Sequence, residues 1–179
     1  MKNNFKFLKT KFKDLYIIKY KENIDERGSF SKLFETNFFN HYKFKKIHQV
    51  NLSKNLKKGT IRGMHYQVKP YQEDKILKCI SGSIFDVVID IRVKSKTYLK
   101  TFTYNLKNDN TLIFIPRGFA HGFQTLENNS HLLYIHGNKF SNKHQKGIAY
   151  DSNFFNISWP LKNKIISERD KKFPNFYEM

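Results

Sequence analysis

The fold class is decided by Ser83-Ile84-Phe85-Asp86-Val87-Val88-Ile89-Asp90-Ile91-Arg92, the most regular stretch of the chain. Its odd positions from 85 to 91 are all large and apolar, whereas its even positions include Asp86 and Asp90. Side chains of a strand alternate between two faces, so this repeat predicts a β-strand with one continuous apolar face. The preceding Ser81-Gly82-Ser83 predicts a tight hairpin turn.

Similar short segments recur along the chain at intervals of about ten residues, which is typical of sandwiches and barrels. The best helix candidate of the first half is 35–43, and Ser167 is suited to cap a turn or short helix after a short strand near 165–166. Many short strands without long helices predict an all-β protein with short peripheral helices. Further strands are expected at 15–20, 29–34, 47–53, 59–66, 75–81, 99–106, 111–116, 121–126 and 131–137, with a turn at 25–28.

Length and composition predict one globular domain over residues 1–179. The chain is 39% apolar and 16% aromatic, which is enough to form a core and excludes wholesale disorder. Its single cysteine, Cys79, excludes a disulfide framework and favours a small core residue in a reducing compartment. No apolar run approaches membrane-spanning length, and the start of the chain lacks a secretory signal pattern, so we expect a cytoplasmic protein without membrane contact.

The net charge of +18 suggests an anionic partner, with nucleic acid as the first class to consider. Only five of the 33 basic residues are arginines, and the lysines are spread over the whole chain rather than gathered on one arm. Such a distribution favours a solvated, lysine-rich surface. We therefore expect no dedicated nucleic-acid partner; a binder would show tight association with a steep salt dependence.

Two histidine-containing segments carry candidate chemistry. In Arg62-Gly63-Met64-His65, strict alternation places Arg62 and His65 on opposite faces, so both reach one pocket only if Gly63 carries a bulge or kink or if the pocket is shared with a second subunit. Lys75, ten residues after His65, fits an adjacent strand, where an ammonium stabilises an anion. Gly118 to Phe123, which contains His121, is typical of a barrel mouth.

Other readings of the same side chains remain open at this stage. Tyr134 and His136 share one strand face, and a buried tyrosine is either a core residue or a proton donor. The separately placed histidines show neither HxH nor HExxH spacing, yet a metal site assembled from distant strands, as in a metal-dependent enzyme, stays an alternative.

Six segments taken together, in order, resemble the dTDP-4-dehydrorhamnose 3,5-epimerase family, whose members act on nucleotide-linked 4-keto-6-deoxy sugars. The resemblance implies a cupin-type jelly roll or β-barrel, a homodimer, and an isomerase that uses neither metal nor cofactor. It rests on Asp25-Glu26-Arg27-Gly28, Gln49-Val50-Asn51-Leu52-Ser53, Arg62-Gly63-Met64-His65-Tyr66-Gln67, 85–92, 118–123 and Ile166-Ser167-Glu168-Arg169-Asp170.

The resemblance also implies catalytic roles for four residues. His65 matches the general base, Asp170 its carboxylate partner, Tyr134 the proton donor and Lys75 the lysine beside the enolate oxygen. The implied reaction is epimerisation at C3 and C5, in which a base removes a proton acidified by the 4-keto group and an acid returns one to the other face. The positions implied to contact the nucleoside-diphosphate sugar are Arg27, Gln49, Asn51, Arg62, His121, Phe140 and Arg169.

Three positions depart from the family pattern. Lys32 and Gln145 stand where glutamates are expected, and Phe140 stands where a tyrosine stacks on thymine. The proton-transfer residues are intact, whereas the base and the sugar are less firmly specified. A dTDP-sugar is favoured; a CDP- or GDP-linked 4-keto sugar, or epimerisation at C3 alone, stays open, and the sequence does not fix the sugar stereochemistry or the pathway served.

Overall fold

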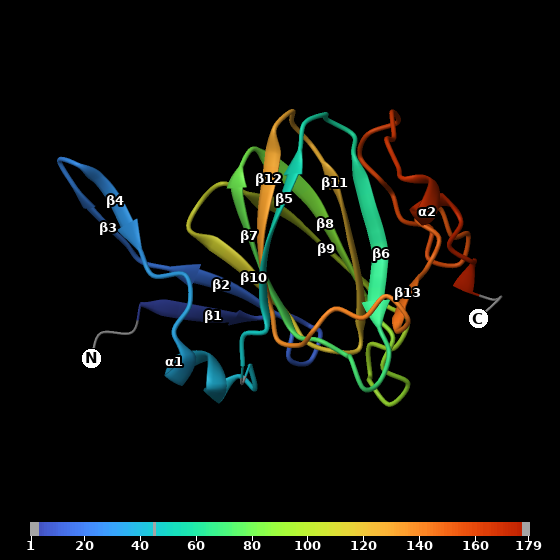
Figure 1. Ribbon diagram of the computed structural model, residues 1–179, viewed down its shortest axis with the longest axis horizontal. Coiled ribbons are helices and arrows are strands. Elements are labelled where there is room, and N and C mark those ends of the chain that lie inside the picture. The colour runs from blue at the N-terminus through green and yellow to red at the C-terminus, as the bar shows by residue number, and fades with distance from the viewer. Residues whose placement is uncertain (1–3, 45, 177–179) are drawn as a thin grey trace.

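The described part of the chain, residues 4–44 and 46–176 of a computed structural model, is built mainly from short β-strands (Figure 1). This confirms the predicted all-β class with two short helices at the periphery. The elements are β1 (Phe5–Lys9), β2 (Tyr16–Tyr20), β3 (Glu22–Asp25), β4 (Gly28–Ser31), α1 (Thr36–His41), β5 (Gln49–Asn55), β6 (Ile61–Gln67), β7 (Lys75–Ser81), β8 (Ser83–Asp90), β9 (Thr101–Lys107), β10 (Thr111–Ile115), β11 (Phe119–Thr125), β12 (Ser130–His136), β13 (Gln145–Gly147) and α2 (Glu168–Lys171).

Strands β5 to β12 form a jelly roll. One antiparallel sheet has the order β1-β2-β10-β7-β12-β5, and the other has the order β13-β6-β11-β8-β9. Within them, β5-β12-β7-β10 and β6-β11-β8-β9 are the two four-stranded halves of a double Greek key. Consecutive strands therefore often lie in opposite sheets, which brings residues distant in sequence to the two walls of one interior.

Both faces of β8 are buried, although only one was expected to be apolar. Its odd positions, Val87 and Ile89, pack in an outer cluster with Ile148, whereas Ile84 and Val88 belong to the cluster between the sheets. The even face therefore points to the interior and carries two buried carboxylates into it. The regularly spaced apolar residues of β8 therefore face outward, where the C-terminal segment covers this sheet.

The aromatic surplus is used in layers within the chain. On the outer face of the six-stranded sheet, Phe39 and Phe44 pack against Phe5, Ile76 and other side chains. On the outer face of the other sheet, Phe155 and Trp159 from the C-terminal segment contact the cluster around Met64. Many of the aromatic side chains therefore form outer layers within the chain, in addition to those between the two sheets.

Several local predictions differ from the structure. The turn at Ser81-Gly82-Ser83 is present, but β7 and β8 lie in different sheets, so the hairpin predicted there is wrong and the chain crosses between sheets. The sequence does not predict β1, β3 or β13, which are short edge or hairpin strands with few buried residues. Edge strands give a weak periodic signal because solvent replaces one neighbour. The predicted turn at 25–28 is confirmed, and it joins β3 to β4.

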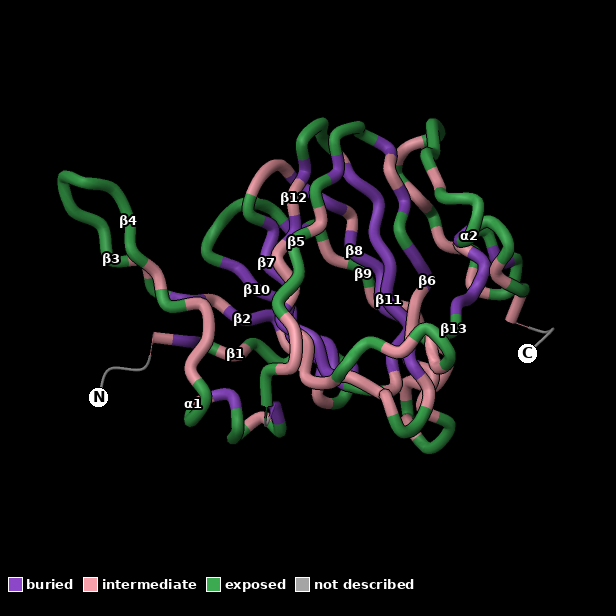
Figure 2. The backbone as a smooth tube through the Cα atoms, in the orientation of Figure 1, coloured by how far each residue is buried: buried purple, intermediate pink, exposed green. Residues whose placement is uncertain are grey.

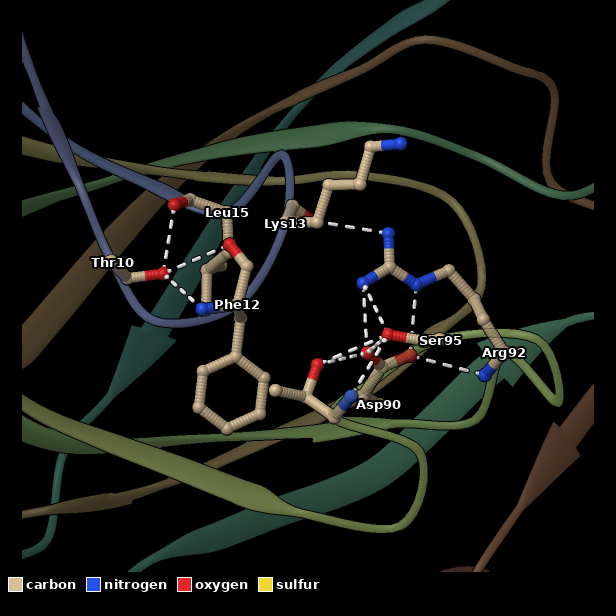
Figure 3. Close-up of polar contacts among 8 residues, drawn as sticks. Thr10, Phe12, Lys13, Leu15, Asp90, Arg92 and Ser95 are labelled. Carbon is tan, nitrogen blue, oxygen red and sulfur yellow. Dashed lines mark hydrogen bonds and ion pairs between the residues drawn. The ribbon is translucent and has the colours of Figure 1, made fainter.

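The end of β8 is tied to the N-terminal loop by a buried carboxylate. Figure 3 shows Asp90 accepting hydrogen bonds from Arg92 and Ser95, while Arg92 also donates to the backbone carbonyl of Lys13. Burial opposes ionisation of Asp90, but these hydrogen bonds outweigh it and lower its pKa. None of these residues lines the cavity described below.

The β3–β4 hairpin projects away from both sheets (Figure 1) and is exposed along its length (Figure 2). Ile24 and Phe30 on it are each 75% exposed. An isolated two-stranded hairpin is marginally stable in water, and exposed large apolar side chains commonly mark a contact surface. The large apolar side chains of the hairpin are therefore left largely unburied by the rest of the described chain.

Candidate active site

A bulge at Gly63 brings Arg62 and His65 to the same cavity. On β11, His121 pairs with His65 and Phe123 pairs with Arg62, so the register shifts between them. Gly63 has a φ of 129°, and a Cβ placed there would lie 2.5 Å from the Cα of Gly122. Only glycine fits this conformation and this close approach. The bulge predicted as a condition for a shared pocket is thus present, and no second subunit is needed for it.

The cavity lies between the two sheets and has a volume of about 270 Å³. Its walls come from β5, β7 and β12 on one side and from β6 and β11 on the other. Residues that the sequence singled out are concentrated here: Gln49, Asn51, Arg62, His65, Lys75, His121, Tyr134 and Phe140 all line it. Gln145 lines it too.

His65 and Asp170 form a hydrogen-bonded pair at one wall. The Nε2 atom of His65 lies 3.0 Å from Oδ1 of Asp170, whose Oδ2 accepts from the backbone N–H of Gly63 at 3.1 Å. Ser167 caps α2 by accepting from the N–H of Asp170, as predicted, and so fixes the carboxylate in place. A carboxylate only accepts, so this bond to Asp170 requires the proton on Nε2 and leaves Nδ1 as the basic nitrogen. The guanidinium of Arg169, a donor 3.2 Å from the same Nε2, then makes no hydrogen bond to it.

Electrostatics give these two groups opposite charge states. Burial lowers the pKa of His65; Asp170 counteracts this, whereas the charges of Arg169 and Lys75 lower it further. Burial would raise the pKa of Asp170, but the hydrogen bonds from His65 and Gly63 outweigh it and hold that pKa at about 2. At neutral pH the pair is therefore a neutral imidazole oriented by a carboxylate, which is the state a general base requires.

Tyr134 lies on the opposite wall from His65, because β12 belongs to the six-stranded sheet and β6 to the other. Burial raises the pKa of Tyr134 far above its ordinary range, and the charge of Asp86 adds to the effect. The phenol is therefore held in its protonated form. Asp86 also accepts from His121 at 2.7 Å, which makes a second buried imidazole–carboxylate pair next to the cavity.

Lys75 is buried in the cavity wall and is paired with a carboxylate that the sequence did not single out. Its Nζ lies 3.1 Å from Glu73, and Glu73 also accepts from Nδ1 of His136 at 2.8 Å. Burial works against ionisation of Glu73, but the charge of Lys75 and the bond from His136 lower its pKa to about 2. His136 was predicted to share a strand face with Tyr134, and the two rings are stacked with centroids 5.7 Å apart.

Two of the predicted contact residues lie outside the lining of this cavity. Arg169 stands behind His65, where its Nη2 is 3.2 Å from Nε2 and its Nη1 donates to Gln145 at 3.0 Å. Arg27 is at the tip of the projecting hairpin, with 84% of its side chain exposed and an ion pair to Asp25. Within one chain the structure does not bring Arg27 to the other predicted site residues.

The described residues show no cluster of three or more histidine, cysteine, aspartate or glutamate side chains arranged to hold a metal ion. Their histidines instead pair with single carboxylates, as at positions 65, 121 and 136. In the same parts of the chain, no helix has the length and apolar character needed to cross a membrane. That the protein works without a metal or another cofactor stays a prediction.

Comparison with known proteins settles the family. Residues 9–178 match the family model described as dTDP-4-dehydrorhamnose 3,5-epimerase. The dTDP-4-dehydrorhamnose 3,5-epimerase of Shigella flexneri is 37% identical over 166 residues, covering 91% of each chain. The chain belongs to the dTDP-4-dehydrorhamnose 3,5-epimerase family. It is an isomerase, as the resemblance implied.

Solved structures of this epimerase family support the cupin-type fold. A Bacillus anthracis dTDP-4-dehydrorhamnose 3,5-epimerase with TDP and PPi bound superposes with a TM-score of 0.91 at 30% identity, covering 96% of this chain and 99% of that one. A dTDP-6-deoxy-D-glucose-3,5-epimerase from Legionella pneumophila, in complex with dTDP-4-keto-L-rhamnose, gives 0.89 at 30% identity, covering 96% and 92%. The predicted cupin-type jelly roll is confirmed.

The three departures from the epimerase pattern lie at different distances from the catalytic pair. Phe140 lines the cavity and is 53% exposed, so its ring face is accessible to a ligand. Gln145 accepts from Arg169, which in turn contacts His65. Lys32 pairs with Glu35 just after the projecting hairpin and does not line the cavity.

Sequence reasoning missed two kinds of site residue in this epimerase. Glu73 lies two residues before Lys75, in the loop that leads into β7, and no motif of the sequence marks it as a partner of that lysine. Gln67 holds the loop that carries Phe140, donating to the carbonyl of Lys139 and accepting from the N–H of Ser141. The role of Gln67 depends on contacts with residues more than seventy positions away in the chain, so no local sequence pattern predicts it.

Proposed function

We propose that the protein epimerises a dTDP-linked 4-keto-6-deoxy sugar at both C3 and C5, with His65 as base and Tyr134 as acid. The observation that carries this proposal is that the two side chains line one cavity from opposite sheets. Inversion at carbon requires removal of a proton from one face and delivery to the other, so a base and an acid on facing walls suit this reaction.

The chemistry follows from the charge states. Neutral His65 takes a proton from the carbon next to the keto group, and the electron pair moves onto the keto oxygen to give an enolate. Asp170 stabilises the imidazolium that forms, and the ammonium of Lys75 stabilises the enolate oxygen. Tyr134 then delivers its proton to the opposite face as the keto group re-forms, and solvent restores both side chains.

A dTDP-sugar is the favoured substrate because two relatives of similar fold were solved with TDP and PPi or with a dTDP-keto sugar. The guanidinium of Arg62 in the lining is suited to a diphosphate, whose oxygens match its paired donors. The exposed ring of Phe140 offers a face on which a nucleobase can stack.

The test is exchange of solvent deuterium into 4-keto-6-deoxy sugars carried by dTDP, CDP or GDP, followed by NMR in D₂O. We expect uptake at C3 and C5 of the dTDP sugar, loss of uptake in His65→Ala, and normal uptake in His41→Ala, an exposed histidine on α1. Uptake at C3 alone would restrict the proposed reaction to that carbon. Uptake with a CDP or GDP sugar would change the proposed nucleotide of the substrate. Absence of exchange with every member of the set would refute the proposed function.

A homodimer is part of the proposal, because it gives Arg27 a route to a ligand. Arg27 is remote from its own cavity, and its hairpin carries the exposed Ile24 and Phe30. In a dimer the hairpin of one protomer would bury these side chains and bring Arg27 to the cavity of its partner.

Subunit mixing tests this arrangement. Arg27→Ala and His65→Ala are each expected to be weakly active or inactive alone. After co-refolding, the mixed dimer has one cavity with an intact His65 and an intact Arg27 from the partner, so activity should return. As a control, the mixing is repeated with Lys107→Ala, an exposed substitution on β9, instead of Arg27→Ala. A monomer by light scattering, or no recovery on mixing, would refute the arrangement.

A further inference from the structure

Three titratable side chains meet at one point of the cavity wall. Lys75 on β7 and His136 on β12 are directly opposite each other in the antiparallel register. Glu73 lies against both, with Oε1 at 3.1 Å from the ammonium of Lys75 and Oε2 at 2.8 Å from Nδ1 of His136. Their side chains are 8%, 11% and 14% exposed for Lys75, Glu73 and His136 respectively, so all three are largely removed from solvent.

Burying such a cluster costs free energy, so its presence in the wall needs an explanation. Removing an ion pair from water costs more than its attraction commonly returns, and apolar side chains would fill the same wall without that cost. Two potential cations directly opposite each other would also repel without the shared carboxylate. The cluster therefore points to a role in the cavity rather than to stability.

Glu73 restricts both neighbours. A carboxylate only accepts, so Nδ1 of His136 must carry the proton in their hydrogen bond. Stacking on Tyr134, at an interplanar angle of 13°, fixes the ring plane. Among the described residues Nε2 of His136 has no hydrogen-bond partner, and His136 lines the cavity. In the neutral ring Nε2 is therefore an acceptor for a ligand.

We propose that Glu73 is a positioning residue that presents the donor Lys75 and the acceptor His136 side by side to an α-hydroxy ketone. The ammonium of Lys75 receives the keto oxygen, and Nε2 of His136 accepts from the hydroxyl on the neighbouring carbon. This rests on the proposed function, in which Lys75 meets the keto group, and adds a contact for the 3-hydroxyl of a 4-keto sugar.

The first test needs no substrate. In protein with ¹⁵N-labelled histidine at pH 8.5, we expect His136, assigned by loss of its signals in His136→Gln, to show a protonated Nδ1 and an unprotonated Nε2. Glu73→Gln should change this tautomer, because an amide can donate as well as accept. Asp74→Asn, a neighbouring buried carboxylate paired with Arg117, should leave it unchanged. A proton on Nε2, an imidazolium at this pH, or an unchanged tautomer in Glu73→Gln would overturn the proposal.

The second test uses the keto sugar and its 3-deoxy analogue. Glu73→Gln should lower kcat/KM about 10- to 100-fold through misplacement of Lys75 and His136. His136→Phe should lose about 10-fold with the hydroxylated sugar and little with the 3-deoxy sugar. Equal losses with both sugars would overturn the assignment of His136. If no sugar reacts, the proposed function fails while the tautomer result still decides the role of Glu73.

Discussion

Replacement of Asp170 by asparagine tests the proposed base most directly, because the two side chains have nearly the same shape. The carboxylate lies 3.0 Å from Nε2 of His65 and is 3% exposed. Two unit charges at that distance attract by about 5–6 kcal/mol for an effective dielectric constant of about 20. That attraction exists only when His65 is protonated, so it stabilises the reaction intermediate and sets a ceiling of about 10⁴-fold on the loss of kcat.

The actual loss of kcat should be smaller than this upper limit, because asparagine keeps the hydrogen bond from Gly63 and remains polar. We therefore expect kcat of Asp170→Asn to fall by about 10²- to 10⁴-fold, measured as the initial rate of deuterium uptake. Asp170 also raises the pKa of His65, so its loss should move the acidic limb of the kcat/KM profile to lower pH. A kcat within about threefold of the wild type, with an unmoved acidic limb, would falsify the assignment.

The same substitution has a predicted effect on folding. The pKa of Asp170 falls from 3.8 to about 2 in the folded protein, which corresponds to about 2–3 kcal/mol of stability at neutral pH. Because the folded pKa is depressed, this contribution is present above about pH 4 and is lost as the pH falls through about 2. Urea unfolding of wild type and Asp170→Asn should therefore differ at pH 7 and converge toward pH 2. A pH-independent difference would contradict this reasoning.

Three further outcomes are expected. Tyr134→Phe should lose about 10²- to 10³-fold in epimer formation yet still wash solvent deuterium into recovered substrate, and loss of both by NMR would contradict its role as acid. Gly63→Ala should lower the free energy of unfolding by about 3 kcal/mol or more, measured by thermal unfolding, because its Cβ would overlap the backbone of Gly122. The control is Gly28→Ala, at a residue that has a φ of 121° but open space around it, and it should lower the free energy of unfolding by only about 1 kcal/mol. Equal losses in the two variants would refute the steric argument. Glu73→Gln should flatten the loss of stability in urea as the pH falls from about 4 to about 2, since the pKa of Glu73 is about 2; an unchanged profile would mean that the carboxylate is not ionised in the folded state.

The strands that line the cavity were largely predictable. The alternation in β8, the strands near β5 to β7 and β9 to β12, and the cap at Ser167 all follow from local periodicity and turn chemistry. The edge strands and the sheet change at Gly82 were not predictable, because pairing partners are chosen by contacts far apart in the chain. The candidate residues were found mainly through ordered motifs, which carry information that local periodicity lacks.

The sequence by itself determined the all-β class, the family and most of the candidate side chains, because strand periodicity and short motifs are local properties. Only the tertiary structure decided that His65 and Tyr134 face one cavity from opposite sheets, that Glu73 joins Lys75 to His136, and that Arg27 stands apart. The physical reason is that a jelly roll places consecutive strands in different layers. Which side chains meet across its interior therefore depends on sheet order, which no short stretch of sequence contains. It also depends on the bulge at Gly63, which the sequence offered as one of two options and the structure decided.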